Sequence, residues 1–439
     1  MVNKVKASPT TLAAAASPMT LAAALQNATI DPAILEQRHG PLLRIGQQVL
    51  GVKPNSNAFL EIWPTGFRSY NLMVPSFLNI PALLLPTYHL KQTVGLAMYA
   101  ASRASGCAYC SAHTCSFAIR RGTAAEKVAM ATQSILTEEV YNETELAVIA
   151  VAESLGRVPT TLTPDERDAL KAVYNPAEVE WIILSVALMG FLNKFMDAVS
   201  VPLEIRMIVP AEQVIAPSGW RAGKHMPTNT TDETKPDKSW LPPIDDLGTI
   251  LGLIPHLPAV IWRNKQWTKG VPNRWPKVGD YLKEHTGHDW PILSKLQHHR
   301  PVQAVATILR DNTDPATSEI GLRLKHLVGL VYATVAEDAE LVQTARKLAK
   351  KAGATSAEIE AVSAFAANGS LEQLKDFERS AVAALQLARV AAPAPSEIMP
   401  EDIEVATREL PPPEIVELLV WMSVLQLIHR LTVFYGTTE

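Results

Sequence analysis

The chain of 439 residues is long enough to form two or three domains with sizeable hydrophobic cores. Its formal net charge is −4 and only 19% of its residues are charged, so the composition argues against a nucleic-acid partner. Hydrophobic residues make up 47% of the chain, but polar residues or prolines break the longest apolar runs before they reach the roughly 20 residues of a membrane span. We therefore expect a soluble protein with no membrane partner, and the three cysteines fit a reducing cytoplasm.

The first 28 residues contain two lysines followed by an alanine-rich stretch, a pattern that export signals share. Ser17 and Pro18 interrupt the apolar stretch, which has to be continuous in such signals. We therefore predict a flexible N-terminal tail over residues 1–28 rather than an export signal.

Helical signals dominate residues 29–209. Within this range, residues 59–86 carry aromatic residues and prolines that indicate turns and short helical pieces, which we expect to wrap over the core and roof the active site. Further along, Gly122 follows two arginines as a helix stop, and Thr163 with Glu166 forms a capping box. No segment shows the alternation of a strand, so we predict an all-α fold.

A linker is predicted over residues 210–246, because this segment is rich in proline, threonine and charge and has no hydrophobic periodicity. Trp220 and Trp240 could anchor it to the surface.

The most reactive residues gather between Gly106 and Gly122, in the sequence GCAYCSAHTCSFAIRRG. Cys107 and Cys110 form a C-x-x-C pair, a spacing typical of redox or metal sites rather than of a disulfide framework. If a helix begins here, Cys107 lies at the positive end of its dipole, where the pKa of a thiol falls. His113 shares a helical face with Cys110 and can exchange a proton with it. Cys115 lies on another face and is expected to be a small buried hydrophobic residue.

Zinc is the main alternative for this stretch. Cys107, Cys110, His113 and Cys115 provide four potential ligands, but they lie on one predicted helix, from which a tetrahedral shell is hard to close, so we expect no metal. His113 by itself could also be an ordinary core histidine.

Two further polar residues have both a functional and a structural interpretation. Arg103, one turn before Cys107, either lowers the pKa of a thiol or is simply solvated. Asn193 lies on an apolar helix, where it either bonds to neighbouring backbone, which we favour, or lines the thiol pocket.

The motif GCAYCSAHT, with LKQTVGLAMYAASRAS before it and RRGTAAEKVAMA after it, resembles the carboxymuconolactone decarboxylase family, and within it the alkylhydroperoxidase D-like (AhpD-like) branch. The likeness extends over residues 90–204. It implies a helical, thiol-dependent peroxidase that reduces hydrogen peroxide or small organic hydroperoxides and has no bound cofactor. The resemblance also implies an electron donor, which would be a dithiol protein, a lipoyl group or a small thiol.

In such a reaction one thiolate attacks the peroxide to give a sulfenic acid, and the second thiol condenses with it to form a disulfide. We predict that Cys110 attacks, His113 is its proton partner and Cys107 resolves the intermediate, although the helix dipole favours the opposite order. The family usually has a glutamate about twelve residues before the first cysteine, where this chain has Gly95. Tyr109 stands where AhpD proper has a histidine. These departures leave a slower thiol peroxidase or a disulfide reductase as alternatives.

Residues 247–439 repeat the first half of the chain. LKHLVGLVYATVAEDAELVQTARK parallels LKQTVGLAMYAASRASGCAYCSAH, and PPPEIVELLVWMSVLQLIHR parallels NPAEVEWIILSVALMGFLNK. We therefore predict two AhpD-like domains arranged as an intrachain pseudo-dimer. The second copy lacks the thiols and the histidine of the motif, because Asp338, Leu341 and Thr344 replace Cys107, Cys110 and His113 respectively.

Two other functions remain open at this stage. A carboxymuconolactone-type decarboxylase needs no paired thiols, so the C-x-x-C pair argues against it. A non-catalytic assembly or redox-sensing protein would use the cysteines only as a reversible disulfide. The family forms assemblies through helical interfaces, so we also predict a homo-oligomer of open order.

Overall fold

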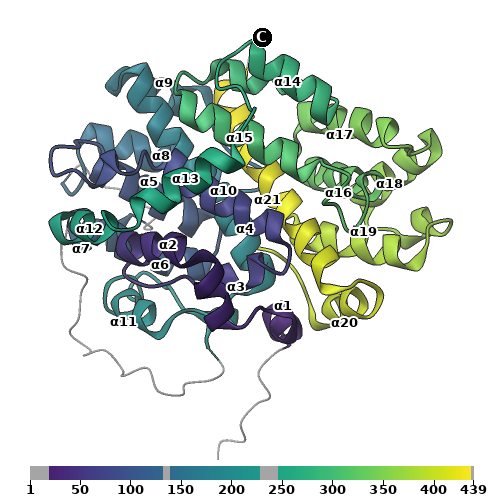
Figure 1. Ribbon diagram of the computed structural model, residues 1–439, viewed down its shortest axis with the longest axis horizontal. Coiled ribbons are helices and arrows are strands. Elements are labelled where there is room, and N and C mark those ends of the chain that lie inside the picture. The colour runs from purple at the N-terminus through teal and green to yellow at the C-terminus, as the bar shows by residue number, and fades with distance from the viewer. Residues whose placement is uncertain (1–18, 132–138, 228–245, 437–439) are drawn as a thin grey trace, which may run out of the picture.

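The computed structural model describes residues 19–131, 139–227 and 246–436 of the chain (Figure 1). Within these ranges every regular element is a helix, and the single β-like feature is an isolated bridge between Val158 and Ala394. The all-α prediction is therefore confirmed.

The elements of the first half are α1 (Leu21–Leu25), η1 (Gln26–Ala28), α2 (Pro32–Leu50), α3 (Ser56–Leu60), α4 (Pro64–Phe77), η2 (Ala82–Leu84), α5 (Lys91–Ala104), α6 (Ala108–Arg120), α7 (Ala125–Met130), α8 (Glu143–Gly156), α9 (Pro164–Val173), α10 (Pro176–Val199), α11 (Ile205–Val214) and η3 (Gly223–His225). Those of the second half are α12 (Asp246–Leu253), α13 (Leu257–Trp267), α14 (Lys277–Thr286), η4 (Pro291–Lys295), α15 (His299–Asn312), α16 (Leu322–Val335), α17 (Ala339–Lys351), α18 (Ser356–Asn368), η5 (Leu371–Leu374), α19 (Arg379–Ala391), α20 (Pro400–Glu409) and α21 (Pro412–Tyr435).

Several helix ends follow the local sequence signals. The predicted capping box of Thr163 and Glu166 starts α9, and Asn175 with Glu178 starts α10 in the same way. In both boxes the side chain of the first residue accepts the N–H of the glutamate, while the glutamate accepts the N–H of the first residue. Gly122 follows α6 with φ +97°, as expected of a helix stop.

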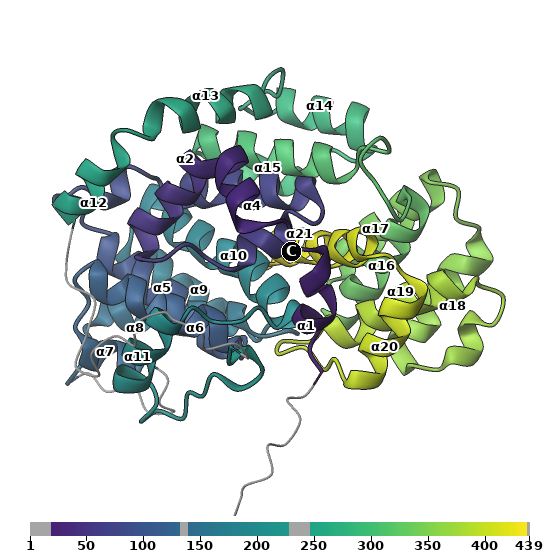
Figure 2. The same ribbon diagram turned by 60° about the horizontal axis from the view of Figure 1, so that its bottom comes forward.

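The centre of the molecule is formed by α10 and α21, which pack against each other along their lengths (Figure 2). Each helix has 24 residues and is apolar enough to cross a membrane by length and composition. However, 94% of the most apolar window of α10 and 83% of that of α21 are buried inside the protein, as in core helices of soluble proteins. The predicted cytoplasmic location and the homo-oligomer stay predictions.

The helices around this centre correspond between the two halves. The pairs α5 and α16, α6 and α17, α9 and α20, and α10 and α21 have 14, 13, 10 and 24 residues respectively. Asp338 caps α17 through the N–H of Leu341, as Cys107 caps α6 through the N–H of Cys110. These features parallel the internal repeat, whereas the pseudo-dimeric domain arrangement stays a prediction.

Each central helix also extends a buried cation into the other half. Lys194 of α10 donates hydrogen bonds to three consecutive carbonyls of residues 391–393. Arg430 of α21 donates to the carbonyls of Val186 and Gly156 and to the hydroxyl of Ser105. Because Ser105 and Gly156 lie beside the C-x-x-C helix, the second half helps to hold the first half's motif in place.

Two segment boundaries differ from the sequence expectations. Residues 1–18 lie outside the described residues, but α1 belongs to the packed structure, with Leu21 and Leu25 buried near α10 and α20. Thr20 caps this helix, which is too short to be recognised from periodicity. Likewise, residues 210–227 of the predicted linker are packed: Trp220 is 2% exposed and donates a hydrogen bond to the carbonyl of Ala108. Trp240 lies outside the described residues.

We predict that Arg430→Met lowers the free energy of unfolding by about 3 kcal/mol, because it leaves buried carbonyls without their charged donor. Urea denaturation measures this change. Arg408→Met is the control, since Arg408 is largely exposed and its loss is expected to cost less than about 0.5 kcal/mol. Equal unfolding midpoints for the two variants would contradict the structural role of Arg430.

Candidate functional site

The C-x-x-C pair lies at the beginning of α6. Gly106, immediately before it, has φ +69°, and a Cβ there would lie 2.9 Å from the ring of Pro395 in the second half. Cys107 is the N-cap residue, and its sulfur accepts the N–H of Cys110 at 3.3 Å. Cys107 and Cys110 are both free thiols and both buried. The predicted position of Cys107 at the positive end of a helix is therefore present.

A cavity of about 50 Å³ lies beside Cys110 and His113, which share one face of α6. Its other lining residues are mainly apolar and come from α2, α3, α4, α5, α6 and α10 and from the loop before α3: Leu50, Pro54, Ser56, Tyr70, Met98, Tyr109, Thr114, Phe117, Met189, Leu192 and Met196. Cys107 does not line this cavity and is completely buried. The two thiols therefore differ in access to a small molecule.

The carboxylate that the sequence expectation lacked is supplied by Glu204, the N-cap residue of α11. One of its oxygens lies 2.7 Å from Nε2 of His113, and the other accepts the hydroxyl of Tyr109 at 3.0 Å and the backbone N–H of Asn55. Glu204 is only 8% exposed. His113 and Glu204 therefore form a buried imidazole–carboxylate pair directed at the cavity that Cys110 lines.

Close packing explains why this carboxylate does not come from position 95. A Cβ on Gly95 would lie 2.9 Å from the Cα of Ala118, since α5 and α6 approach each other closely there. No larger side chain fits without separating the helices. Sequence reasoning missed Glu204, although an acidic residue between the apolar stretches SVPL and IRMIV was a usable signal.

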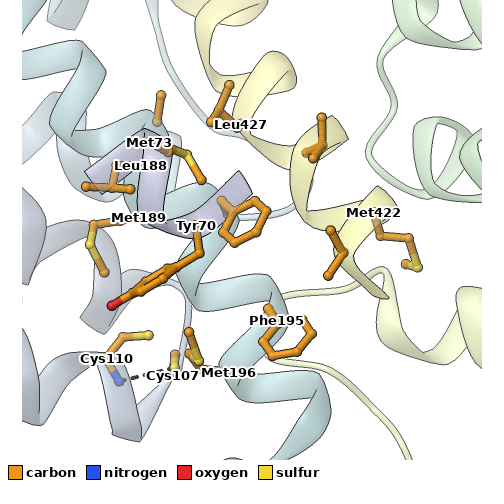
Figure 3. Packing of buried hydrophobic residues seen from close by; sticks show 14 of the residues in the cluster. Tyr70, Met73, Cys107, Cys110, Leu188, Met189, Phe195, Met196, Met422 and Leu427 are labelled. Carbon is orange, nitrogen blue, oxygen red and sulfur yellow. Dashed lines mark hydrogen bonds between the residues drawn. The ribbon is translucent and has the colours of Figure 1, made fainter. Parts of the chain in front are cut away.

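Two tyrosines complete the walls around Cys110. Tyr109 stacks on His113 with ring centroids 4.4 Å apart, and burial together with Glu204 raises its pKa well above the ordinary value. Tyr70 comes from α4, in the segment expected to roof the site, and its hydroxyl points toward Cys110 (Figure 3). Burial, with Glu204, also raises the pKa of Tyr70. Both phenols are therefore neutral hydrogen-bond donors at physiological pH.

Burial also raises the pKa of Cys110 well above that of an ordinary thiol, and the neighbouring Cys107 adds to this effect. The positive charge of Arg430 opposes the shift but does not reverse it. Cys110 therefore rests as a thiol and needs a base to become a nucleophile, and the His113–Glu204 pair lies on its face of the helix.

The other residues singled out from the sequence lie away from this cavity. Cys115 is fully buried, and burial raises its pKa to about 12. Arg103 donates to the carbonyl of Ser218, and its charge lowers the pKa of Cys115 rather than that of Cys110. Asn193 donates to the hydroxyl of Ser105, which agrees with the structural interpretation, and it lines a separate polar cavity.

The four zinc ligands considered from the sequence do not form a cluster among the described residues. Instead, the sulfur of Cys107, a carboxylate oxygen of Asp197 and a ring nitrogen of His225 lie within 4.8 Å of one another, all buried. Neither Asp197 nor His225 was identified from the sequence, because one lies late on α10 and the other in the predicted linker.

Among known proteins, no protein-family model and no curated protein matches the chain. Among solved structures, the debrominase Bmp8 in its apo form is 22% identical and aligns with a TM-score of 0.37, covering 42% of this chain and 96% of the debrominase. A variant of Bmp8 in complex with 2,3,4-tribromopyrrole gives the same identity and TM-score over 42% of this chain and 95% of its own. A similarity of this extent assigns neither a family nor an activity to the chain.

Proposed function

We propose that this protein is a thiol-dependent oxidoreductase that reduces small organic hydroperoxides. The observation that carries the proposal is the cavity in which Cys110 and His113 lie together, with Glu204 behind the imidazole. A thiol, a base within reach and a group that orients the base are the elements of nucleophilic thiol chemistry. Cys107, the other cysteine of the C-x-x-C pair, supplies the second thiol that a dithiol–disulfide cycle needs.

The reaction begins at Cys110, because this thiol lines the cavity whereas Cys107 does not. With Nε2 of His113 donating to Glu204, Nδ1 is left to accept the thiol proton. The thiolate attacks one oxygen of the hydroperoxide, the O–O bond breaks, and the leaving oxygen takes the proton to become an alcohol. Cys110 is then a sulfenic acid, which condenses with Cys107 to give a disulfide and water.

The substrate class follows from the lining of the cavity. Apart from the tyrosines, the histidine, the thiol and two hydroxyl side chains, its walls are leucine, methionine, proline or phenylalanine side chains. A cavity of about 50 Å³ admits only a small molecule, and its apolar walls favour an organic one. The cycle closes only when an external thiol or dithiol reduces the disulfide, so an electron donor of that class is part of the proposal.

We predict that stoichiometric tert-butyl hydroperoxide converts the reduced protein to a Cys107–Cys110 disulfide, which mass spectrometry locates and dithiothreitol reverses. Cys110→Ser is expected to abolish peroxide consumption, because it removes the attacking sulfur. Cys107→Ser stops at a sulfenic acid on Cys110, which dimedone traps. Cys115→Ser is the matched control and keeps the wild-type rate. Thiols that do not react with hydroperoxide at all would refute the proposal.

We predict that Glu204→Gln slows oxidation of Cys110 about 100-fold, since the imidazole loses the charge that orients it and stabilises its protonated form. Stopped-flow kinetics of thiol loss measures the rate. Glu180→Gln is the matched control: Glu180 is a buried carboxylate that accepts two backbone N–H groups, of Gln297 and His298, away from the cavity. If both variants slow the oxidation of Cys110 equally, Glu204 affects the rate only by stabilising the fold, contrary to the prediction.

A pH profile follows from the raised pKa of Cys110. A thiol whose pKa is raised is less ionised at a given pH, so the rate of alkylation of Cys110 by iodoacetamide should reach half its maximum above pH about 8.5, the midpoint of an ordinary thiol. Site-resolved mass spectrometry separates Cys110 from the other two cysteines. A plateau below pH about 8 would show that the resting thiol is already ionised, contrary to the structure.

A further inference from the structure

We propose that Cys107 has a proton partner of its own, His225, which Asp197 positions, so that each thiol of the C-x-x-C pair is served by a separate imidazole–carboxylate pair. This inference rests on the proposed function, since it assigns the residue that activates the resolving thiol. The first pair, His113 and Glu204, serves Cys110 from the cavity side, and the second serves Cys107 from the buried side.

The geometry of His225 leaves one ring nitrogen free for this role. Nδ1 donates to the carbonyl of Val201 at 2.8 Å, which fixes the orientation of the ring. Nε2 is buried and has no hydrogen-bond partner among the described residues, although Oδ1 of Asp197 lies 3.7 Å away. His225 itself is only 1% exposed, so this nitrogen does not contact bulk solvent. A ring nitrogen of His225 lies within 4.8 Å of the sulfur of Cys107, a separation that one water molecule or a small side-chain adjustment closes.

Asp197 is held as a charged group. The backbone N–H and the hydroxyl of Ser396 both donate to its Oδ2 at 2.7 Å, and the ammonium of Lys224 lies 3.1 Å from Oδ1. Burial alone would raise the pKa of this carboxyl, but His225, Lys224 and Ser396 together hold it below the usual value. A carboxylate fixed beside Nε2 stabilises the protonated imidazole that forms when His225 takes a proton from Cys107.

Other charged and titratable groups lie near Cys107 and His225. Lys224 precedes His225 in η3, Lys194 lies one turn before Asp197 on α10, and Arg430 reaches in from α21. The ring of Tyr109 lies 6.0 Å from that of His225 and is neutral. Burial lowers the pKa of Lys194 to about 7, so it is only partly charged at neutral pH. Lys224 and Arg430, two cations against one carboxylate, disfavour a bound divalent metal at Cys107, Asp197 and His225, although these residue types also bind zinc.

In the resolving step, Nε2 of His225 accepts the proton of the Cys107 thiol. The resulting thiolate attacks the sulfur of the Cys110 sulfenic acid, a sulfur–sulfur bond forms and the sulfur–oxygen bond breaks. Hydroxide leaves and takes the proton from His225, which gives water. The oxidant is the hydroperoxide that formed the sulfenic acid, so no further co-reactant is needed.

The test separates formation of the sulfenic acid from its resolution. In His225→Gln, we expect hydroperoxide to oxidise Cys110 at nearly the wild-type rate, but disulfide formation at pH 7 to slow at least about tenfold, with Cys110 accumulating as a dimedone adduct. The rate should recover as the pH rises and Cys107 ionises unaided. His113→Gln should show the reverse, with slow oxidation and normal resolution. His429→Gln is the structural control, because His429 is a buried histidine 2.7 Å from the carboxylate of Asp338 in the second half.

A second measurement does not depend on peroxide chemistry. In the Cys110→Ser, Cys115→Ser protein only Cys107 remains, and ultraviolet absorbance follows its thiolate against pH. Adding His225→Gln should raise the midpoint by at least about one pH unit, whereas His429→Gln should leave it unchanged. Unchanged midpoints and resolution rates in His225→Gln, or stoichiometric zinc that this substitution releases, would overturn the inference. A shifted midpoint in a protein that ignores hydroperoxides would keep the inference and refute the proposed function.

Discussion

The packing of α10 against α21 is the constraint on which the rest of the structure depends. It buries two 24-residue apolar helices against each other, and the free energy of this burial holds two halves of the chain that are joined by a long connection. The contact between α10 and α21 also places Lys194 and Arg430 inside the opposite half, where they bond to Ala392 and Ser105 respectively. It therefore holds the loops at these residues in place as well as the helices. The C-x-x-C motif begins at one of these loops, so its geometry depends on residues that carry no thiol chemistry.

This dependence gives the second half a physical role. Arg430 contacts Ser105 two residues before Cys107, and Pro395 packs against Gly106. Ser396, next in the chain, holds Asp197. The second half, which contains no cysteine, therefore supplies a cation, a packing surface and a hydrogen-bond donor to the first half. A separate subunit could make the same contributions in a dimer.

How well the sequence predicts the fold and the candidate site depends on how far apart in the chain the interacting residues lie. Local signals worked well: the capping box at Thr163, the stop at Gly122 and the helical spacing of Cys110 and His113 are all present, because each depends on residues within one or two turns. By contrast, Glu204 lies 91 residues from His113, and nothing in its local sequence indicates which side chain it meets. His225 was placed in a linker, since prolines and polar residues around it resemble a loop whose burial only the tertiary structure reveals.

The same distinction applies to the departure from the family pattern at Gly95. From the sequence it removes a carboxylate from the expected place, which suggests a weakened site. In the structure the lack of a side chain lets α5 and α6 touch, and a carboxylate reaches the same imidazole from the start of α11. What thiol chemistry requires is a charge at a position in space, and a helical scaffold can provide that charge from more than one segment. A site of this kind is therefore better judged by the groups that surround its histidines than by the spacing of a motif.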